Sequence, residues 1–359
     1  MAALKIATVI GARPQFIKAG AVSRVIAGRD DVAEVLIHTG QHFDDAMSAV
    51  FFRELDLPEP SYNLNVVSQS HGQMTGRMLE QVEAVLCEER PDLVLVYGDT
   101  NSTLAGALAA SKLNIPIAHI EAGLRSFNRR MPEEVNRVVT DHISSIQLCP
   151  TQASVENLRR EGIVENVHHT GDVMFDATLF TINGAARHSA VISRLGLTRG
   201  QYAVCTVHRA ENTDDPARLM ALASYLRTIG TQQTLVLPLH PRTRGALARH
   251  EIDLGPVVMI EPLGYVDLQA LVAGAAIVYT DSGGLQKEAY FHGKPCVTLR
   301  DETEWVETIS HGWNRLWYHT DFVEPRLPIA DYGEGNAAGK IVNLLCEYLG
   351  SGKAAQSAS

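Results

Sequence analysis

Residues 119–137 contain acidic and basic side chains in an arrangement that suits acid/base chemistry. Glu121 follows an apolar run that predicts a strand, and Glu133 comes directly after Pro132, which starts a predicted helix. Asp99 follows the preceding apolar run. Four cations lie among or beside these acids: Arg125, Arg129, Arg130 and Arg137. Acids at neighbouring strand ends, surrounded by cations, indicate general acid/base catalysis on an anionic substrate. A helix start with solvated ion pairs is an equal alternative for this segment alone.

A second candidate site follows a predicted strand in the other half of the chain. Ser282, Gly283 and Gly284 connect that strand to a helix. Paired glycines let a ligand approach the backbone, and a helix start offers free amides to a diphosphate. Glu288 lies in the first turns of the helix, where a carboxylate accepts hydrogen bonds from a ribose diol. The alternative is an ordinary strand–helix turn capped by Ser282.

Two cations and one histidine occupy comparable strand ends. Arg13 and Lys18 lie at the first strand–helix junction, where they are suited to neutralise a phosphate, with a surface pair as the alternative. His208 ends the first strand of the second half. A lone histidine is usually structural, but this one is predicted at the sheet edge where ligands bind.

Strands and helices must position these residues, and the sequence contains ten short apolar runs that predict strands. Segments of helical periodicity, such as 73–89 and 103–112, separate the runs. The runs are 5–10, 34–38, 93–97, 115–120, 145–149, 202–207, 234–239, 257–260, 276–280 and 295–299. Because they lack two-residue alternation, they are typical of strands buried on both faces of a parallel sheet. Five such strands in each half predict an α/β protein with two doubly wound domains whose strand ends face a common cleft.

The length of 359 residues also favours two domains. We predict an N-terminal domain over 1–180 and a second domain over 181–335, with the boundary inside 170–195 and a linker at Asn183–Ala186. A terminal helix over 336–350 is predicted to return to the first domain. Residues 351–359, small and polar, are predicted to be a disordered tail.

Composition excludes several classes of protein. A net charge of −10 without any Lys/Arg run argues against a nucleic-acid surface. The five scattered cysteines form no C-x-x-C pair and predict free thiols in a reducing cytoplasm. The chain shows no apolar stretch of membrane-spanning length and no cationic signal peptide. The sequence also lacks a strand-linked dinucleotide fingerprint and metal-ligand spacing, so we expect neither NAD nor a metal.

Motifs in both halves resemble those of the non-hydrolysing UDP-N-acetylglucosamine 2-epimerases. They lie, in the order of that family, at 11–18, 39–42, 98–100, 121–125, 132–134, 208–212 and 282–288. The resemblance extends over about residues 4–350. It implies a GT-B fold of two Rossmann-like domains, a nucleotide-sugar in the cleft, a homodimer and no redox cofactor. It also implies C2 inversion by elimination of UDP to a 2-acetamidoglucal and re-addition of UDP.

The resemblance assigns roles by position. The catalytic set is Asp99, Glu121, Glu133 and His208. The UDP contacts are Arg13, Lys18, His208, Leu263, Ser282, Gly283, Gly284 and Glu288. An allosteric or substrate-carboxylate role falls to Gln15, Gln41, His42, His240 and Lys287.

Three positions depart from the pattern of the plain UDP-N-acetylglucosamine enzymes. Gln15 and Lys287 replace acids, and Trp305 replaces an arginine. Two of these changes make the site less acidic, which favours a substrate with an extra negative charge. The chain therefore looks most like the subgroup that acts on UDP-2,3-diacetamido-2,3-dideoxyglucuronate for bacterial surface polysaccharides. The alternatives are a UDP-N-acetylglucosamine 2-epimerase, a GT-B glycosyltransferase and a catalytically silent nucleotide-sugar binding protein.

Overall fold

The structure is a computed structural model that describes residues 3–40, 57–67 and 70–357. It divides into two units, one of Met1–Ala177 with Ala330–Ser359 and one of Thr178–Ile329. The first change of unit falls inside the predicted window of 170–195, within helix α7 (Val173–Asn183). The predicted linker at Asn183–Ala186 lies instead inside the second unit, where Ala186 is part of a core cluster.

The first unit contains a seven-stranded sheet in the order β3-β2-β1-β4-β5-β6-β7, and its strand pairs are parallel. Its strands are β1 (Leu4–Ile10), β2 (Val32–His38), β3 (Tyr62–Asn63), β4 (Leu93–Tyr97), β5 (Ile117–Ile120), β6 (Ile146–Cys149) and β7 (Val167–His169). Strands β4, β5 and β6 are buried along their whole length, as expected for a sheet covered on both faces.

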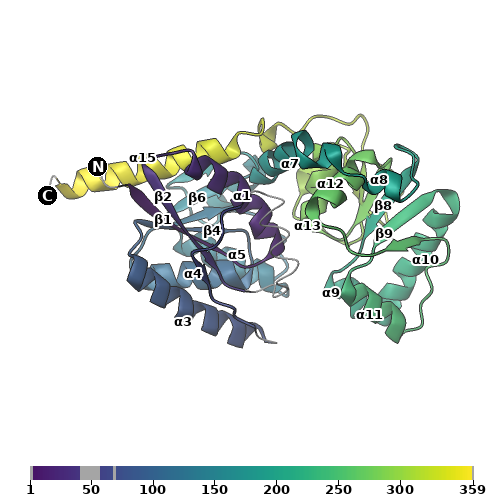
Figure 1. The fold of residues 1–359 in the computed structure, drawn as a ribbon, viewed down its shortest axis with the longest axis horizontal. Coiled ribbons are helices and arrows are strands. Elements are labelled where there is room, and N and C mark those ends of the chain that lie inside the picture. Colours follow the sequence, from purple (N-terminus) through teal and green to yellow (C-terminus); the bar gives the residue numbers. More distant parts are fainter. Residues whose placement is uncertain (1–2, 41–56, 68–69, 358–359) are drawn as a thin grey trace. The chain divides into compact units, whose positions relative to one another are not determined.

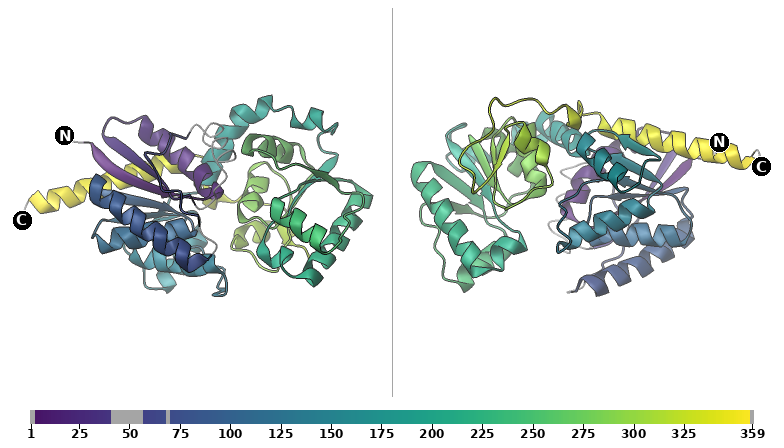
Figure 2. Two further views of the ribbon diagram at one scale, coloured as in Figure 1. Left: turned by 60° about the horizontal axis from the view of Figure 1, so that its bottom comes forward. Right: turned by 180° about the vertical axis from the view of Figure 1, so that it is seen from behind.

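Helices cover both faces of this sheet. They are α1 (Arg13–Ala27), α3 (His71–Glu89), α4 (Asn101–Lys112), α5 (Pro132–Ile143), α6 (Gln152–Arg160), α7, the short η2 (Ala330–Tyr332) and α15 (Ala337–Ser357). Helix α15 runs beside α1 on one side of the sheet, while α3, α4 and α5 lie on the other (Figure 1), and the two views of Figure 2 agree.

The second unit contains a six-stranded parallel sheet in the order β10-β9-β8-β11-β12-β13. Its strands are β8 (Tyr202–Thr206), β9 (Thr234–Pro238), β10 (Val258–Ile260), β11 (Ile277–Thr280), β12 (Cys296–Thr298) and β13 (Asn314–Leu316). Its helices are η1 (Ala185–His188), α8 (Val191–Arg194), α9 (Ala210–Thr213), α10 (Pro216–Gln232), α11 (Pro241–Arg249), α12 (Tyr265–Gly274), α13 (Gly283–Phe291) and α14 (Val306–Ser310).

Alternating residues of one strand enter the two cores of this second sheet. Ala203 and Cys205 pack with α10 and α11, whereas Tyr202 and Val204 pack with α8, α12 and α13. The two-residue period of a strand thus fills both faces with apolar side chains. This explains why the strand appears in the sequence as a continuous apolar run.

All ten predicted strands are present, within a few residues at their ends, and the predicted fold class is confirmed. The prediction of five strands in each half was wrong because it missed β3, β7 and β13. These strands have only two or three residues and lie at sheet edges, so they give no periodic signal.

The chain returns to the first unit earlier than predicted, before residue 336. Asp331 and Tyr332 bind the first unit: the Tyr332 carbonyl accepts from the Asp172 amide at 3.1 Å, and the Asp331 carbonyl lies 2.8 Å from Nε2 of His169. Asp176 then accepts from the amides of Ala337 and Ala338 at the start of α15. Residues 351–357 were predicted to be part of a disordered tail, but they continue α15. The lysine and alanines of this segment have high helix propensity. No described helix is long and apolar enough to cross a membrane.

Candidate functional site

Each sheet has one switch point, from which the strand order runs in opposite directions. In the first unit it lies between β1 and β4, and in the second between β8 and β11. Ligands of doubly wound sheets bind outside the carboxyl ends of the strands at such points. The residues that closely follow β1, β4, β5, β8 and β11 are therefore the candidates, and they include Arg13, Asp99, Glu121, His208 and Ser282–Gly284.

Lys18 and Glu121 form a nearly buried ion pair at the edge of the first sheet. Lys18 extends from α1, Glu121 follows β5, and each side chain is 9% exposed. Glu121 has a backbone φ of +71°. This left-handed conformation costs a residue other than glycine on the order of 1–3 kcal/mol and is concentrated at functional positions. The amide of Glu121 donates to the Leu148 carbonyl at 3.0 Å, which ties the strained turn to β6.

The ion pair fits because residue 98 is a glycine. A Cβ on Gly98 would lie 3.0 Å from Oε2 of Glu121 and 3.5 Å from Nζ of Lys18. Gly98 also has a φ of +62°, which a residue with a side chain rarely adopts. The turn after β4 therefore leaves room for the ion pair and continues directly into Asp99.

Arg137 on α5 connects Asp99 to Glu134. Its guanidinium forms an ion pair with Asp99 and donates to Glu134 at 2.6 Å. Glu134 also accepts from the amides of Ser126 and Phe127 at 3.0 and 2.9 Å. Burial alone would raise the pKa of Glu134, but the Ser126 amide and Arg137 hold that pKa below its ordinary value. Glu134 is thus a buried carboxylate that shapes the loop, while the Asp99 side chain stays 31% exposed.

Glu133 and Arg13 both lie in the first turn of a helix at this sheet edge. Glu133 is the second residue of α5, next to Glu134, and is partly buried. Arg13 is the first residue of α1 and is also partly buried. The structure thus brings Arg13, Lys18, Asp99, Glu121 and Glu133 to one edge of the sheet.

Gln15 uses its whole side-chain amide inside the first unit. Its Oε1 accepts from the amides of Gly11 and Ala12 at 2.8 and 3.0 Å. Its Nε2 donates to the Tyr97 carbonyl at 2.9 Å and to Oγ1 of Thr103 at 3.0 Å. These bonds join the turn after β1 to the start of α4. Gln15 therefore positions the turn after β1. The resemblance assigned Gln15 an allosteric or substrate-carboxylate role, whereas in this structure its side-chain amide is hydrogen-bonded inside the first unit.

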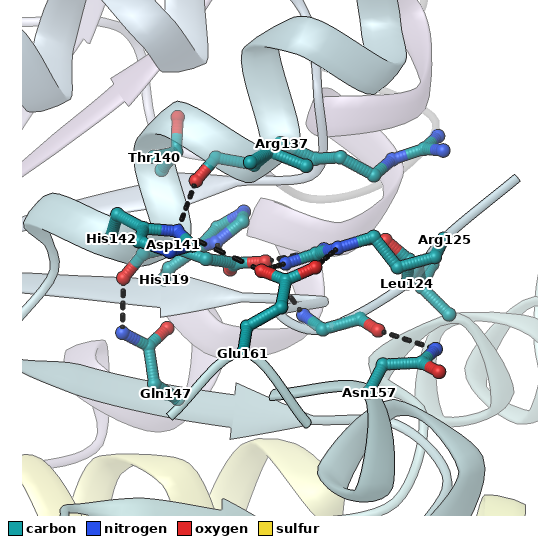
Figure 3. A network of polar contacts seen from close by, with 12 residues as sticks. His119, Leu124, Arg125, Arg137, Thr140, Asp141, His142, Gln147, Asn157 and Glu161 are labelled. Atoms are coloured by element: carbon teal, nitrogen blue, oxygen red, sulfur yellow. Dashed lines mark hydrogen bonds and ion pairs between the residues drawn. The ribbon is translucent and has the colours of Figure 1, made fainter. Parts of the chain in front are cut away.

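A buried polar network lies below the β4 and β5 strand ends (Figure 3). His119 on β5 lies 2.7 Å from Asp141 through Nδ1 and 2.7 Å from the Gly98 carbonyl through Nε2. Asp141 also accepts from Arg125 at 2.7 Å, and Arg125 binds Glu161 through two nitrogens at 2.7 and 2.8 Å. The network connects the strand that ends in Glu121 to the turn that precedes Asp99.

Asp281 organises the switch point of the second unit. Its fully buried carboxylate accepts from the amides of His208 and Arg209, each at 2.9 Å, and from Nδ2 of Asn212 at 3.0 Å. Nδ1 of His208 lies 3.1 Å from the same carboxylate. Burial alone would raise the pKa of Asp281, but His208 and the surrounding donors hold it below its ordinary value. The His208 ring, 38% exposed, is therefore oriented by a buried anion.

Ser282, Gly283 and Gly284 form the start of α13, directly after Asp281. The Ser282 hydroxyl accepts from the Leu285 amide at 3.5 Å, so it caps the helix as predicted from its residue type. A Cβ on Gly283 would lie 2.6 Å from Oε1 of Glu304, whereas a Cβ on Gly284 would meet only the Ser282 hydroxyl at 4.0 Å among the described atoms. The turn is therefore open beside Gly284. Glu288 lies two turns into the helix and is 5% exposed.

Lys287 and Trp305, two of the three positions that depart from the family pattern, contact each other. The Lys287 ammonium lies 3.6 Å from the centroid of the Trp305 ring, and both side chains are buried. The indole Nε1 of Trp305 has no hydrogen-bond partner among the described residues. Together the pair holds one positive charge beside the start of α13.

The remaining predicted residues are less central. His240 is exposed and caps α11, where its Nδ1 accepts from the Arg242 amide at 3.2 Å. Its ring lies 5.5 Å from the His208 ring. Leu263 is partly buried and packs on the core next to α12. Gln41 and His42 lie outside the described residues.

Sequence reasoning did not choose Arg137, His119 or Asp281 as site residues. Arg137 and His119 lie inside the charged segment 119–137, and Asp281 directly follows an apolar run. Position at a strand end was therefore a usable signal for Asp281. The roles of the other two depend on contacts with residues distant in sequence, which their positions do not indicate.

Comparison with known proteins places these features in a family context. The family model described as UDP-N-acetylglucosamine 2-epimerase matches residues 24–346. A Pseudomonas aeruginosa protein named UDP-2,3-diacetamido-2,3-dideoxy-D-glucuronate 2-epimerase is 52% identical over 87% of this chain and 88% of its own length. A Methanococcus maripaludis protein named UDP-N-acetylglucosamine 2-epimerase is 44% identical over 87% of each chain.

Solved structures of similar proteins have the same architecture. The Methanocaldococcus jannaschii UDP-GlcNAc 2-epimerase in complex with UDP-GlcNAc and UDP aligns with a TM-score of 0.88 and 39% identity, over 96% of this chain and 100% of that one. The Neisseria meningitidis UDP-GlcNAc 2-epimerase bound to UDP-GlcNAc aligns with a TM-score of 0.86 and 29% identity, over 96% and 100%. The two doubly wound sheets are thus those of a GT-B fold.

Proposed function

The chain belongs to the UDP-N-acetylglucosamine 2-epimerase family, and from this premise we propose that it epimerises UDP-2,3-diacetamido-2,3-dideoxyglucuronate at C2 to the manno form. The family is one of UDP-sugar 2-epimerases, which are isomerases. The observation that carries the choice of sugar is the 52% identity to the relative named for that substrate, over nearly nine-tenths of both chains.

The proposed reaction conserves atoms and electrons without an added redox partner. A base removes the C2 proton while the bond from C1 to the UDP oxygen breaks, which leaves a 2-acetamidoglucal and UDP. A proton then adds to the opposite face of C2, and the UDP oxygen re-forms the bond to C1. The path requires carboxylates to move protons and cations or amides to stabilise the leaving diphosphate.

The first unit supplies the acids for this proposal. Asp99, Glu121 and Glu133 lie at one sheet edge, and two of them are held by cations: Glu121 by Lys18 and Asp99 by Arg137. General acid/base catalysis requires carboxylates that are held in position in this way. The strained backbone of Glu121 also supports a functional role for that residue.

The second unit supplies the groups for UDP. The open turn at Ser282–Gly284 offers helix-start amides to a diphosphate, and Glu288 follows on the same helix. His208, fixed by Asp281, ends the neighbouring strand. In the first unit, the resemblance assigns Arg13 and Lys18 to the diphosphate by their charge.

The buried cation of the Lys287–Trp305 pair supports a uronate over a neutral sugar. A buried charge is screened less than a solvated one, so the Lys287 ammonium, buried against the Trp305 ring, affects the local potential. A substrate with a carboxylate on the sugar benefits from that potential. UDP-N-acetylglucosamine, the alternative substrate, has no such carboxylate.

Deuterium incorporation tests the reaction and the substrate together. Each sugar nucleotide is incubated with the protein in D₂O, and C2 is followed by NMR. We expect deuterium at C2 of both epimers of the uronate and much slower exchange in UDP-N-acetylglucosamine. Equal turnover of the two nucleotides contradicts the uronate assignment. UDP release that needs an acceptor and leaves C2 unlabelled indicates a glycosyltransferase.

Three further properties belong to this proposal: a homodimer, no cofactor, and a cytoplasmic role in surface-polysaccharide synthesis such as that of lipopolysaccharide O-antigen. The mass of the protein in solution, measured by light scattering, tests the dimer. Activity that survives dialysis against a chelator, with no nicotinamide present, tests the absence of a cofactor. Deletion of the gene and analysis of the surface polysaccharide for the manno uronate tests the role.

A further inference from the structure

Each ring nitrogen of His119 lies close to an oxygen atom that can only accept a hydrogen bond. Its Nδ1 lies 2.7 Å from a carboxylate oxygen of Asp141 (Figure 3). Its Nε2 lies 2.7 Å from the carbonyl oxygen of Gly98. A neutral imidazole has only one N–H, so one of these close contacts would bring two lone pairs together. Both contacts are favourable only when both nitrogens carry hydrogen.

From this geometry we propose that His119 is a buried imidazolium that positions Asp99 and Glu121 for catalysis. It touches neither of those carboxylates in the contacts described, so it is a positioning residue. The part of the proposal that concerns catalysis rests on the proposed epimerase function. The part that concerns the charge of the ring does not.

The charges of the four linked side chains alternate in sign when the His119 ring is charged. From Asp141 on α5 the network continues to Arg125, in the segment after β5, and then to Glu161 after α6. With a protonated ring the signs alternate along His119, Asp141, Arg125 and Glu161, and their sum is zero. With a neutral ring, Asp141 and Arg125 still balance each other, and the remaining negative charge is that of Glu161, whose side chain is 25% exposed.

Other groups close to this network leave the balance unchanged. On β6, Cys149 is buried and its pKa is raised to about 12 by burial, so the thiol is neutral. Gln147 donates from Nε2 to the carbonyls of Asp141 and Ser144. On α5, His142 lies 3.7 Å from Glu161 at the exposed end of the network, and Arg137 is paired with Asp99 and Glu134.

The carbonyl that His119 binds connects the network to the acids. It belongs to the peptide between Gly98 and Asp99, and Gly98 has the left-handed backbone that this turn requires. On the other side of Asp99, the Asp99 carbonyl accepts from Asn136 at 2.9 Å. His119 is also two residues before Glu121, so its fixed ring anchors the end of β5 as the chain enters its second left-handed turn. Both turns thus depend on one ring.

The first test measures the protonation state of the ring directly. Protein labelled with ¹⁵N-histidine is examined by NMR, and the His119 signals are identified among the 14 histidines as those absent from His119→Gln. We expect both ring nitrogens of His119 to carry slowly exchanging protons at neutral and mildly alkaline pH. A ring with one protonated nitrogen at neutral pH overturns the proposal, whatever reaction the protein catalyses.

The second test measures the effect on catalysis. His119→Phe keeps an aromatic ring but removes both donors, and we expect kcat for the epimerisation to fall about 10²-fold, the loss typical of a misplacement of about 1 Å. KM and the affinity for UDP should change less than about threefold, because the described contacts of His119 are to Asp141 and Gly98 and not to the residues assigned to UDP. His119→Gln, which keeps an N–H donor, should retain more activity than the phenylalanine variant.

The control is His142→Gln, because His142 is half-exposed and contacts the network only at its margin. This variant should keep the wild-type kcat. An unchanged kcat in His119→Phe, or a loss confined to KM, contradicts the positioning role. If the phenylalanine variant does not fold, the NMR measurement on the wild-type protein still decides the charge of the ring. If no sugar nucleotide is epimerised by the wild-type protein, the proposed function fails while the protonation result stands.

Discussion

The Lys287 ammonium lies 3.6 Å from the ring centroid of Trp305, and the two buried side chains form one cation–π pair. Lys287 is on α13 and Trp305 precedes α14. A desolvated contact of this kind contributes about 2 kcal/mol. The two positions at which the resemblance indicates departures from the family pattern therefore contact each other.

Removing the Lys287 charge should change the preference between substrates. A unit charge acting over about 10 Å at an effective dielectric constant of about 20 contributes roughly 1.5 kcal/mol, or about tenfold. We therefore expect Lys287→Met to lower kcat/KM for the uronate nucleotide about tenfold relative to UDP-N-acetylglucosamine. Lys112→Met, which removes an exposed lysine at the end of α4, is the control. Equal losses for both nucleotides would show that the pair only stabilises the fold.

Glu121→Gln should abolish most of the activity. The amide has nearly the same shape but neither accepts a proton nor forms the ion pair with Lys18. We expect kcat to fall by about 10²-fold or more, with UDP affinity little changed. Glu165→Gln, an exposed site, provides the matched control. Full activity in the Glu121 variant would remove Glu121 from the catalytic set.

Gly98→Ala should reduce both stability and activity. The new methyl group would lie 3.0 Å from Glu121 and would require a left-handed backbone, at a cost of about 1–3 kcal/mol. Gly76→Ala is the control, because Gly76 lies inside α3 with no described atom within 4 Å of the added Cβ. Alanine there should stabilise the protein by about 0.5–1 kcal/mol. Urea unfolding and steady-state kinetics measure both effects, and a neutral Gly98 variant contradicts the crowding argument.

The pH dependence of stability should report Asp281. Its pKa is below the ordinary value of 3.8 because the donors around it, His208 first, outweigh the effect of burial. The stabilisation by this carboxylate is therefore complete above about pH 4 and is lost as the pH falls through the folded-state pKa. Asp281→Asn should lower the unfolding free energy at neutral pH by about 3 kcal/mol. The substitution should also reduce the loss of unfolding free energy as the pH falls into the acid range. If that loss is unchanged, other carboxylates cause it.

The sequence predicted the architecture because burial on both faces leaves a simple pattern. Ten apolar runs indicated ten strands of two parallel sheets, and all ten are present. The family resemblance, which rests on the motifs after those strands, is confirmed by the family match. The edge strands β3, β7 and β13 were missed because two or three residues with partial exposure have no detectable period.

Sequence position alone indicated that Asp99, Glu121 and Ser282–Gly284 lie at strand ends, because parallel strands bring their carboxyl ends to one edge of a sheet. Which side chains meet at that edge was decided only by tertiary structure. Lys18 pairs with Glu121 across 103 positions of sequence, and Arg137 with Asp99 across 38. Gln15, to which the resemblance assigned an allosteric or substrate-carboxylate role, instead bonds the turn after β1 to the distant Tyr97 carbonyl. Such contacts depend on how each helix packs against the sheet. The residue pattern specifies which face of a helix is buried, but it does not specify which residues that face contacts.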